Sequence, residues 1–212
     1  MTIGLPPPVA GTTRLILLRH GEPDDTVQGR CYGRLDPGLS PRGREQMRHT
    51  WRLLHDQPPA AIYSSPSRRA VESVELRAAS TPAAVVDERF REIDFGAFEG
   101  LTYREISTRH PQKYEEWMTR PTEVLFPAGE SFATMSARVR SGLEQVRRMH
   151  PGGTVVIMSH GGVNRVALAE ALELDPRHLF RLAQAYGCVN VIDHVGDEPM
   201  VRMMNATLHD PC

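Results

Sequence analysis

Short, continuous apolar runs alternate with amphipathic segments along most of this chain of 212 residues. Runs of this kind lie at 14–19, 60–65, 83–88 and 153–159. They are typical of strands that are buried on both faces of a sheet. Helical patterns lie at 39–54, 66–80, 131–149 and 161–174. The alternation predicts an α/β fold, a three-layer sandwich in which a mainly parallel sheet is flanked by helices.

The rest of the chain fits around this alternation. Segments 188–195 and 199–205 are expected to be late strands, and weaker helical signals lie at 102–109 and 111–119. We therefore predict a single domain over 14–205 with a cap insertion at about 100–128. The proline- and glycine-containing residues 1–13 are expected to form a loose N-terminal tail, and 206–212 a C-terminal tail.

Charge and cysteine content narrow the class of partner. The formal net charge is −1, so no overall field favours nucleic acid or a membrane surface, and attraction for an anion has to be local. The N-terminus lacks the pattern of a signal peptide, and no apolar run approaches the roughly 20 residues that span a bilayer. Cys31, Cys188 and Cys212 form no CxxC motif, and an odd count leaves one unpaired. These features predict a cytoplasmic protein without nucleic-acid or membrane partners.

Basic and imidazole side chains stand where three of the predicted strands end. Arg19 and His20 follow the first strand, Arg69 lies in the first turn of the helix after 60–65, and His160 follows 153–159. In sheets of this type, ligands bind at the carboxyl ends of the strands, where helix N-termini also point. We therefore expect a compact positive pocket at this edge of the sheet.

The residue types in this pocket suit phosphate chemistry. Arginine offers planar, bidentate donors to phosphate oxygens. A histidine that is neutral near pH 7 has one ring nitrogen free to attack phosphorus. The hypothesis is that the first strand holds His20 rigidly within a phosphate site, where the ring acts as a nucleophile.

Five sequence blocks resemble a known family. The blocks LLRHGE, YSSPSRRAVES, REIDFGAFEG, FPAGES and MSHGGVNR occur in this order. Together they resemble the histidine phosphatase superfamily, in its phosphoglycerate mutase-like branch, from Arg14 to about Val191. Each block falls at a predicted strand end or helix start, which makes the resemblance specific.

The resemblance implies a role for each matching residue. His20 matches the histidine that becomes phosphorylated, and Arg19 and Arg69 match the arginines that bind the phosphoryl group. Glu92 matches the acid that protonates the leaving oxygen. His160 matches the second histidine, which stabilises the phosphoryl group during transfer. The residues around 100–128 correspond to a small cap over the site.

The substrate side of the pocket is implied by the same resemblance. The residues that match are Thr26, Arg30, Tyr32, Gly33 and Gly161. The chain departs from the family pattern at Pro23, where relatives often have Thr, and at Thr26, where they often have Asn. Thr26 keeps a hydroxyl group but lacks the amide.

Several alternatives remain at the level of the residues alone. Without the resemblance, Glu92 cannot be chosen over Glu88, Glu99 or Glu105 as the acid. Two histidines and a carboxylate can bind zinc, but no HxxxH or HxH spacing is present, and two arginines would repel a cation. No metal and no cofactor are therefore expected. A non-catalytic phosphate- or partner-binding module is a further alternative, although every matched position is occupied.

The expected enzyme is a phosphomonoester hydrolase of histidine acid type that acts on a small phosphorylated metabolite. The alternative is a cofactor-dependent phosphoglycerate mutase, whose relatives have a longer insertion with paired arginines. Segment 100–129 has no adjacent arginine pair, and PAGES at 127–131 resembles the PGGES turn of phosphatases such as α-ribazole phosphatase. The cap aromatics, among them Tyr103 and Trp117, either contact the substrate or fill the cap's own core. The substrate's identity and the oligomeric state are not encoded in any pattern that we detect.

Overall fold

A single mixed sheet forms the centre of the computed structural model, which describes residues 4–207. Its order is β3-β2-β4-β1-β5-β6. The strands are β1 (Thr13–Arg19), β2 (Ala61–Ser64), β3 (Ala84–Val86), β4 (Thr154–Ser159), β5 (Val189–Val195) and β6 (Glu198–Ala206). Strands β3, β2, β4 and β1 run parallel, whereas β5 and β6 are antiparallel additions at one edge. The expected α/β class with a mainly parallel sheet is confirmed.

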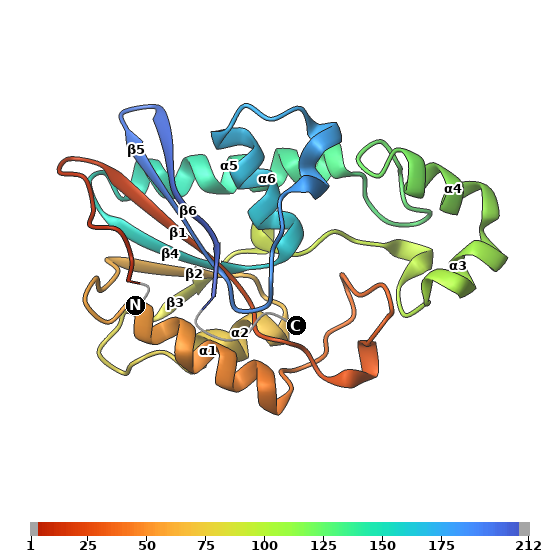
Figure 1. Ribbon diagram of the computed structural model, residues 1–212, viewed down its shortest axis with the longest axis horizontal. Coiled ribbons are helices and arrows are strands. Elements are labelled where there is room, and N and C mark those ends of the chain that lie inside the picture. The colour runs from red at the N-terminus through yellow and green to blue at the C-terminus, as the bar shows by residue number, and fades with distance from the viewer. Residues whose placement is uncertain (1–3, 208–212) are drawn as a thin grey trace.

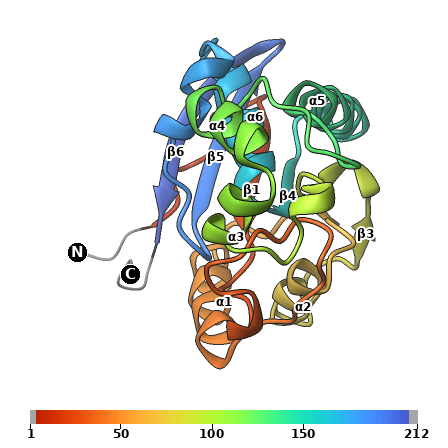
Figure 2. The same ribbon diagram turned by 90° about the vertical axis from the view of Figure 1, so that its right-hand side faces the viewer.

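Helices cover both faces of this sheet (Figures 1 and 2). One face carries α1 (Pro41–Leu53) and α2 (Arg68–Glu75), and the other carries α5 (Phe132–Met149) and α6 (Gly161–Ala171). The small helices α3 (Tyr103–Arg109) and α4 (Pro111–Thr119) project beyond the sheet, in the segment for which we predict a cap. The three layers thus match the sandwich that the sequence predicts.

Strand β1 shows why these apolar runs are continuous. Leu15 and Leu17 join the core beneath α5 and α6, while Ile16 and Leu18 join the core beneath α1 and α2. All four side chains are at most 1% exposed. Since neighbouring residues of a strand point to opposite faces, a strand covered on both sides needs apolar residues at every position.

Some elements are shorter than the sequence predicts. Helix α2 ends at Glu75 rather than at residue 80, because Arg77 turns back to donate to the carbonyls of Val74 and Pro82. Strand β3 covers three residues of the predicted 83–88, and Asp87 already caps the short 3₁₀ turn that follows. Helix α6 ends before residue 174, because Glu173 adopts a left-handed conformation.

The cap has an aromatic core of its own. Trp117 stacks on Tyr103 at 5.3 Å between ring centroids and meets Phe126 edge-on at 5.4 Å. Phe95 and Phe98 complete the cluster. Trp117 and Phe126 are buried, so these two rings fill the cap.

Both ends of the described chain contact the domain. Of the loose tail predicted at 1–13, residues 1–3 lie outside the described part of the chain. In the described part, Arg14 donates to the carbonyls of Pro6 and Pro7, and β1 begins at Thr13. Arg14 also forms a buried ion pair with Asp193 of β5, at 2.6 Å. At the other end Ala206 still belongs to β6, and residues 208–212 of the predicted C-terminal tail, with Cys212, lie outside the described residues. Within 4–207, no helix is long and apolar enough to cross a membrane.

Candidate active site

The two histidines meet because β1 and β4 are adjacent and parallel. Arg19 is in register with Ser159, so His20 and His160 leave neighbouring strands at the same level. Their ring centroids lie 5.1 Å apart, with the rings edge to face. His20 is 2% exposed and His160 is fully buried. The structure thus brings the two predicted histidines together at the carboxyl edge of the sheet.

Hydrogen bonds on both ring nitrogens fix the tautomer of His20. Nδ1 lies 2.7 Å from the carbonyl oxygen of Gly21, which can only accept, so Nδ1 carries the proton. Nε2 accepts a hydrogen bond from Nε of Arg69 at 3.3 Å. The lone pair of Nε2 is therefore directed toward Arg69, where an arginine-bound phosphoryl group would lie. This is the arrangement that a nucleophilic histidine needs.

The surroundings keep both rings neutral. Burial lowers the pKa of His20 well below its ordinary value of 6.5, and Arg69 and Arg19 lower it further. Burial, followed by the charge of Arg69, lowers the pKa of His160 in the same direction. A neutral imidazole at position 20 is available for attack even in mildly acidic solution.

Arg69 is held by the loop that follows Tyr32. Its two terminal nitrogens donate to the carbonyls of Leu35, at 2.9 Å, and Gly33, at 3.2 Å. The side chain is fully buried. Three of the five guanidinium donors are thus used for positioning or for the bond to His20, which leaves further N–H groups for a ligand.

Glu99 organises that same loop. Its carboxylate accepts hydrogen bonds from the main-chain N–H groups of Gly33, Arg34, Leu35 and Phe95, at 2.9–3.1 Å. A carboxylate with four backbone donors is engaged in holding the loop. This separates Glu99 from Glu92, a distinction that the residues alone do not make.

Arg19 is positioned by residues near the end of the chain. One terminal nitrogen donates to the carbonyl of Gln184, and the guanidinium carbon lies 3.9 Å from the centre of the Tyr186 ring. The hydroxyl of Tyr186 bonds to that of Tyr32 at 2.6 Å, and the Tyr32 ring lies 5.1 Å from the guanidinium carbon of Arg69. Each arginine thus lies against one member of a bonded tyrosine pair.

Two buried nitrogens near His20 have no hydrogen-bond partner among the described residues. They are Nε of Arg19 and Nδ1 of His160, whose other ring nitrogen lies 2.7 Å from Oγ of Ser65. A buried donor without a partner is costly, so such atoms mark places where a ligand oxygen would be stabilising. If Ser65 donates to Nε2 of His160, the proton sits on Nδ1, which then donates to a phosphoryl oxygen.

Glu92 lies against the start of α6. Its carboxylate accepts from the main-chain N–H of Gly162 at 3.1 Å and from that of Ile93 at 2.9 Å. A Cβ at position 162 would come within 2.3 Å of Oε1 of Glu92, so only glycine allows this approach. Gly162 follows His160 by two residues, and Glu92 is half-buried at the same edge of the sheet. The structure brings Glu92 together with the predicted catalytic residues.

The predicted substrate-binding residues divide into two groups. Tyr32, Gly33 and Gly161 belong to the site: Tyr32 and Gly33 contact Arg69, and Gly161 begins α6 beside Arg19. Thr26 is exposed, and its main-chain N–H donates to Asp24. Arg30 is exposed and donates to the carbonyl of Gly100 at the base of the cap. The structure does not bring Thr26 or Arg30 into contact with the predicted catalytic residues.

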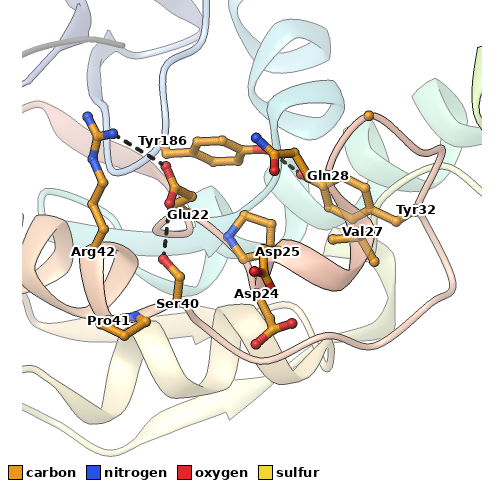
Figure 3. A pocket seen from close by; sticks show the side chains of 12 residues that line it. Glu22, Asp24, Asp25, Val27, Gln28, Tyr32, Ser40, Pro41, Arg42 and Tyr186 are labelled. Carbon is orange, nitrogen blue, oxygen red and sulfur yellow. Dashed lines mark hydrogen bonds and ion pairs between the residues drawn. The ribbon is translucent and has the colours of Figure 1, made fainter.

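A cavity of about 560 Å³ opens beside this centre (Figure 3). Tyr32 and Tyr186 line it together with the loop at 22–29 and the start of α1. Glu22 lies on the cavity between Ser40, which donates to it at 3.2 Å, and Arg42, at 4.0 Å. Because the same tyrosines contact Arg19 and Arg69, the cavity and the catalytic side chains share a wall.

Several residues of the site were not predicted. Ser65 follows β2, Arg165 lies on α6, and Gln184 and Tyr186 lie in the connection before β5. Ser65 and Arg165 stand inside the recognised sequence blocks, so their position was a usable signal. Nothing in the pattern of 182–188 connects Gln184 or Tyr186 with Arg19.

Over the described part of the chain, no group of three histidine, cysteine, aspartate or glutamate side chains is placed to hold a metal.

Comparison with known proteins agrees with this geometry. The sequence model of the histidine phosphatase superfamily (branch 1) matches residues 15–207. Phosphoserine phosphatase 1 of Hydrogenobacter thermophilus is 32% identical over 201 residues, covering 92% of this chain and 93% of the relative.

Solved structures give the same result. The α-ribazole phosphatase of Shigella flexneri superposes with a TM-score of 0.83 at 25% identity, covering 91% of this chain and 96% of the other. Phosphoserine phosphatase of Entamoeba histolytica, in complex with 3-phosphoglyceric acid, gives a TM-score of 0.81 at 26% identity, with coverage of 93% and 98%.

Proposed function

Since this chain belongs to the histidine phosphatase superfamily (branch 1) and is a phosphatase of small phosphorylated metabolites, we propose that it works through a phosphohistidine on His20. The observation that carries the proposal is the pair of bonds on the His20 ring. The proton on Nδ1 and the lone pair of Nε2 facing Arg69 support attack by Nε2 on phosphorus. Activity of this kind makes the enzyme a phosphatase of histidine acid type.

The first step transfers the phosphoryl group to the enzyme. Nε2 of His20 forms a bond to phosphorus while the bond from phosphorus to the ester oxygen breaks. Arg19 and Arg69 bind the phosphoryl oxygens, and Nδ1 of His160 donates to one of them. Glu92 gives its proton to the departing oxygen, since an alkoxide leaves poorly at neutral pH without one.

The second step releases phosphate. The carboxylate of Glu92 takes a proton from water as the water oxygen attacks phosphorus, and the bond to Nε2 of His20 breaks. Phosphate leaves, the lone pair returns to Nε2, and Glu92 is protonated again for the next turnover. All groups in this cycle are supplied by the chain, so we propose that the reaction needs no metal or cofactor.

A panel of phosphomonoesters tests the proposed activity. Phosphoserine, α-ribazole phosphate and p-nitrophenyl phosphate should release inorganic phosphate with the wild-type enzyme and not with His20→Ala. With 3-phosphoglycerate and a catalytic amount of the bisphosphate, phosphate should appear and little 2-phosphoglycerate should form. Rapid isomerisation without phosphate release would identify a mutase instead.

We also propose that the protein works in a reducing compartment, the cytoplasm. Cys31 and Cys188 are free and buried, which supports this proposal because secreted domains commonly pair their cysteines. Alkylation of free thiols in denaturant, at the moment the source cells are lysed, would test it because unfolding exposes both buried cysteines. Finding the cysteines oxidised there would contradict it.

A further inference from the structure

Arg165 on α6 carries a positive charge that no carboxylate in the described chain balances. It is half-buried, and no acidic oxygen from 4–207 lies within ion-pair distance. Its Nε donates to the carbonyl of Leu182 at 2.8 Å, and its guanidinium carbon lies 5.6 Å from the centre of the Phe180 ring. The side chain is thereby held in place, while its two terminal nitrogens have no hydrogen-bond partner in this part of the chain.

One of these nitrogens, Nη1, lies beside the proposed catalytic residues. A Cβ at Gly161 would come within 3.1 Å of Nη1 of Arg165 and within 3.5 Å of Nε of Arg19. The two guanidinium groups therefore approach one point, from which glycine keeps side-chain atoms away. Burial lowers the pKa of Arg165, and the charge of Arg19 lowers it further, while Glu92 acts in the opposite direction. The charges of both Arg19 and Glu92 therefore act on Arg165.

Carboxylates are shared unequally among the arginines of the site: Asp36, Glu92 and Glu99 act electrostatically on Arg69, whereas Glu92 alone of these acts on Arg165. Arg19, Arg69 and Arg165 bring three positive charges to this edge of the sheet. Glu92 contributes no charge in the protonated form that donates to the leaving oxygen, so in that form no carboxylate of the described residues offsets the charge of Arg165. Half-burying an unbalanced cation beside another cation is unfavourable, so the remaining charge calls for a second anion.

We infer that Arg165 determines specificity by binding a second anionic group, a carboxylate or a further phosphate, on the alcohol part of the substrate. The transferring phosphoryl group already has its donors in Arg19, Arg69 and His160. Arg165 approaches Arg19 at Gly161, and Glu92, the proposed proton donor to the departing oxygen, lies against the neighbouring Gly162. The inference rests on the proposed phosphatase function and names the substrate class for the same site.

Pairs of substrates that differ mainly in the second anion test this directly. Phosphoserine and phosphoethanolamine differ by a carboxylate, and fructose 1,6-bisphosphate and fructose 6-phosphate differ by a phosphate. In at least one pair, the wild-type enzyme should have the higher kcat/KM for the substrate that carries the second anionic group. Arg165→Gln should remove about 10- to 100-fold of that preference, mainly through KM, with little effect on the member that lacks the second anion. The pair whose kcat/KM ratio changes in Arg165→Gln shows whether the second anion is a carboxylate or a phosphate.

A ratio of two substrates on one preparation does not depend on the fraction of folded enzyme. Arg165→Lys provides a second variant, which keeps the charge and should retain part of the preference. Arg181→Gln is the control, because Arg181 is an exposed arginine of the nearby 3₁₀ turn, Pro176–Arg181. It should leave both ratios unchanged.

Two results would overturn the inference. Equal loss on both members of each pair would assign Arg165 to the transferring phosphoryl group or to folding alone. Unchanged ratios in Arg165→Gln would leave it without a role in recognition. Failure of the proposed function looks different, because wild-type enzyme would then hydrolyse neither member of any pair nor p-nitrophenyl phosphate.

Discussion

Nε of Arg69 donates a hydrogen bond to Nε2 of His20 at 3.3 Å. In the proposed mechanism, the arginine that binds a phosphoryl oxygen is thus already directed at the lone pair that attacks phosphorus. Because Nδ1 of His20 is occupied by the carbonyl of Gly21, the ring cannot offer its other nitrogen.

Glu92→Gln should slow alkyl phosphates by about 10²- to 10⁴-fold, since glutamine cannot protonate the leaving oxygen. p-Nitrophenyl phosphate should suffer much less, because nitrophenolate departs without a proton. Comparing kcat for phosphoserine and p-nitrophenyl phosphate measures this difference. Equal slowing of both substrates would show that the acid is another residue.

Glu99→Gln should affect both substrates alike. Its amide would set an N–H group against the backbone donors of Gly33, Arg34 and Leu35, so the loop that holds Arg69 should loosen. We expect a loss of about 1–3 kcal/mol in the free energy of unfolding, measured with urea. A selective loss on alkyl phosphates would instead make Glu99 the proton donor.

Gly162→Ala should disturb Glu92 and leave the fold largely intact. The new Cβ would meet Oε1 of Glu92 at 2.3 Å and Cε of Met135 at 2.9 Å, and both atoms end flexible side chains that can move. Hydrolysis of alkyl phosphates should fall more than that of p-nitrophenyl phosphate, with a small change in Tm. Gly4→Ala, with nothing within 4 Å, is the control. Unaltered activity on alkyl phosphates would contradict the placement of Glu92.

Tyr186 should act mainly through its ring. Tyr186→Phe removes the hydroxyl bond to Tyr32 but keeps the aromatic face at Arg19, whereas Tyr186→Ala removes both. A cation–π contact contributes about 1 kcal/mol, so kcat/KM should fall several-fold more in the alanine variant. If phenylalanine and alanine cause the same loss, the hydroxyl pair rather than the ring positions Arg19.

The buried histidines should make stability depend on pH in a defined window. In the unfolded chain His20 titrates near 6.5, while in the fold its pKa lies well below that value. The unfolded chain therefore takes up a proton that the folded protein refuses, and the free energy of unfolding falls as the pH drops below 6.5. Each such group should account for about 1 kcal/mol between pH 6.5 and 5.5.

Urea unfolding at the two pH values measures this effect. Between pH 6.5 and 5.5, the free energy of unfolding of His20→Ala should fall by about 1 kcal/mol less than that of the wild type, which is the contribution of one histidine. An identical loss in both proteins would mean that His20 titrates normally in the fold.

The sequence predicted those parts of the site that depend on strand ends. Apolar runs identify β1 and β4, and since these strands are parallel neighbours, the residues that follow them, His20 and His160, have to meet. The antiparallel addition of β5 and β6 was not predicted, because alternation of apolar residues does not encode strand direction.

Contacts between loops that are distant in the sequence could not be predicted either, because local sequence patterns do not encode them. Arg30 turns to the carbonyl of Gly100, and Tyr186 reaches Tyr32 across 154 positions. Such pairings depend on where the folded chain places each loop, and no local propensity carries that information. The resemblance to a family selected Glu92, and the backbone bonds of Glu99 give the physical reason for preferring it.

Metal independence is a further expectation of this account. EDTA should leave phosphate release unchanged, and added Mg²⁺ or Zn²⁺ should not raise it appreciably, because histidine, arginine and glutamate supply the chemistry. Loss of activity in EDTA with recovery on adding a metal would contradict the cycle proposed above.

The central claim is that Nε2 of His20 carries the phosphoryl group, and rapid quenching with ³²P-labelled substrate tests it most directly. Label should appear on the protein within one turnover, be lost in acid, survive in alkali, and map by digestion to the peptide that contains His20. His20→Ala should acquire no label and release no phosphate. Label on another residue, or turnover by His20→Ala at the wild-type rate, would contradict the account.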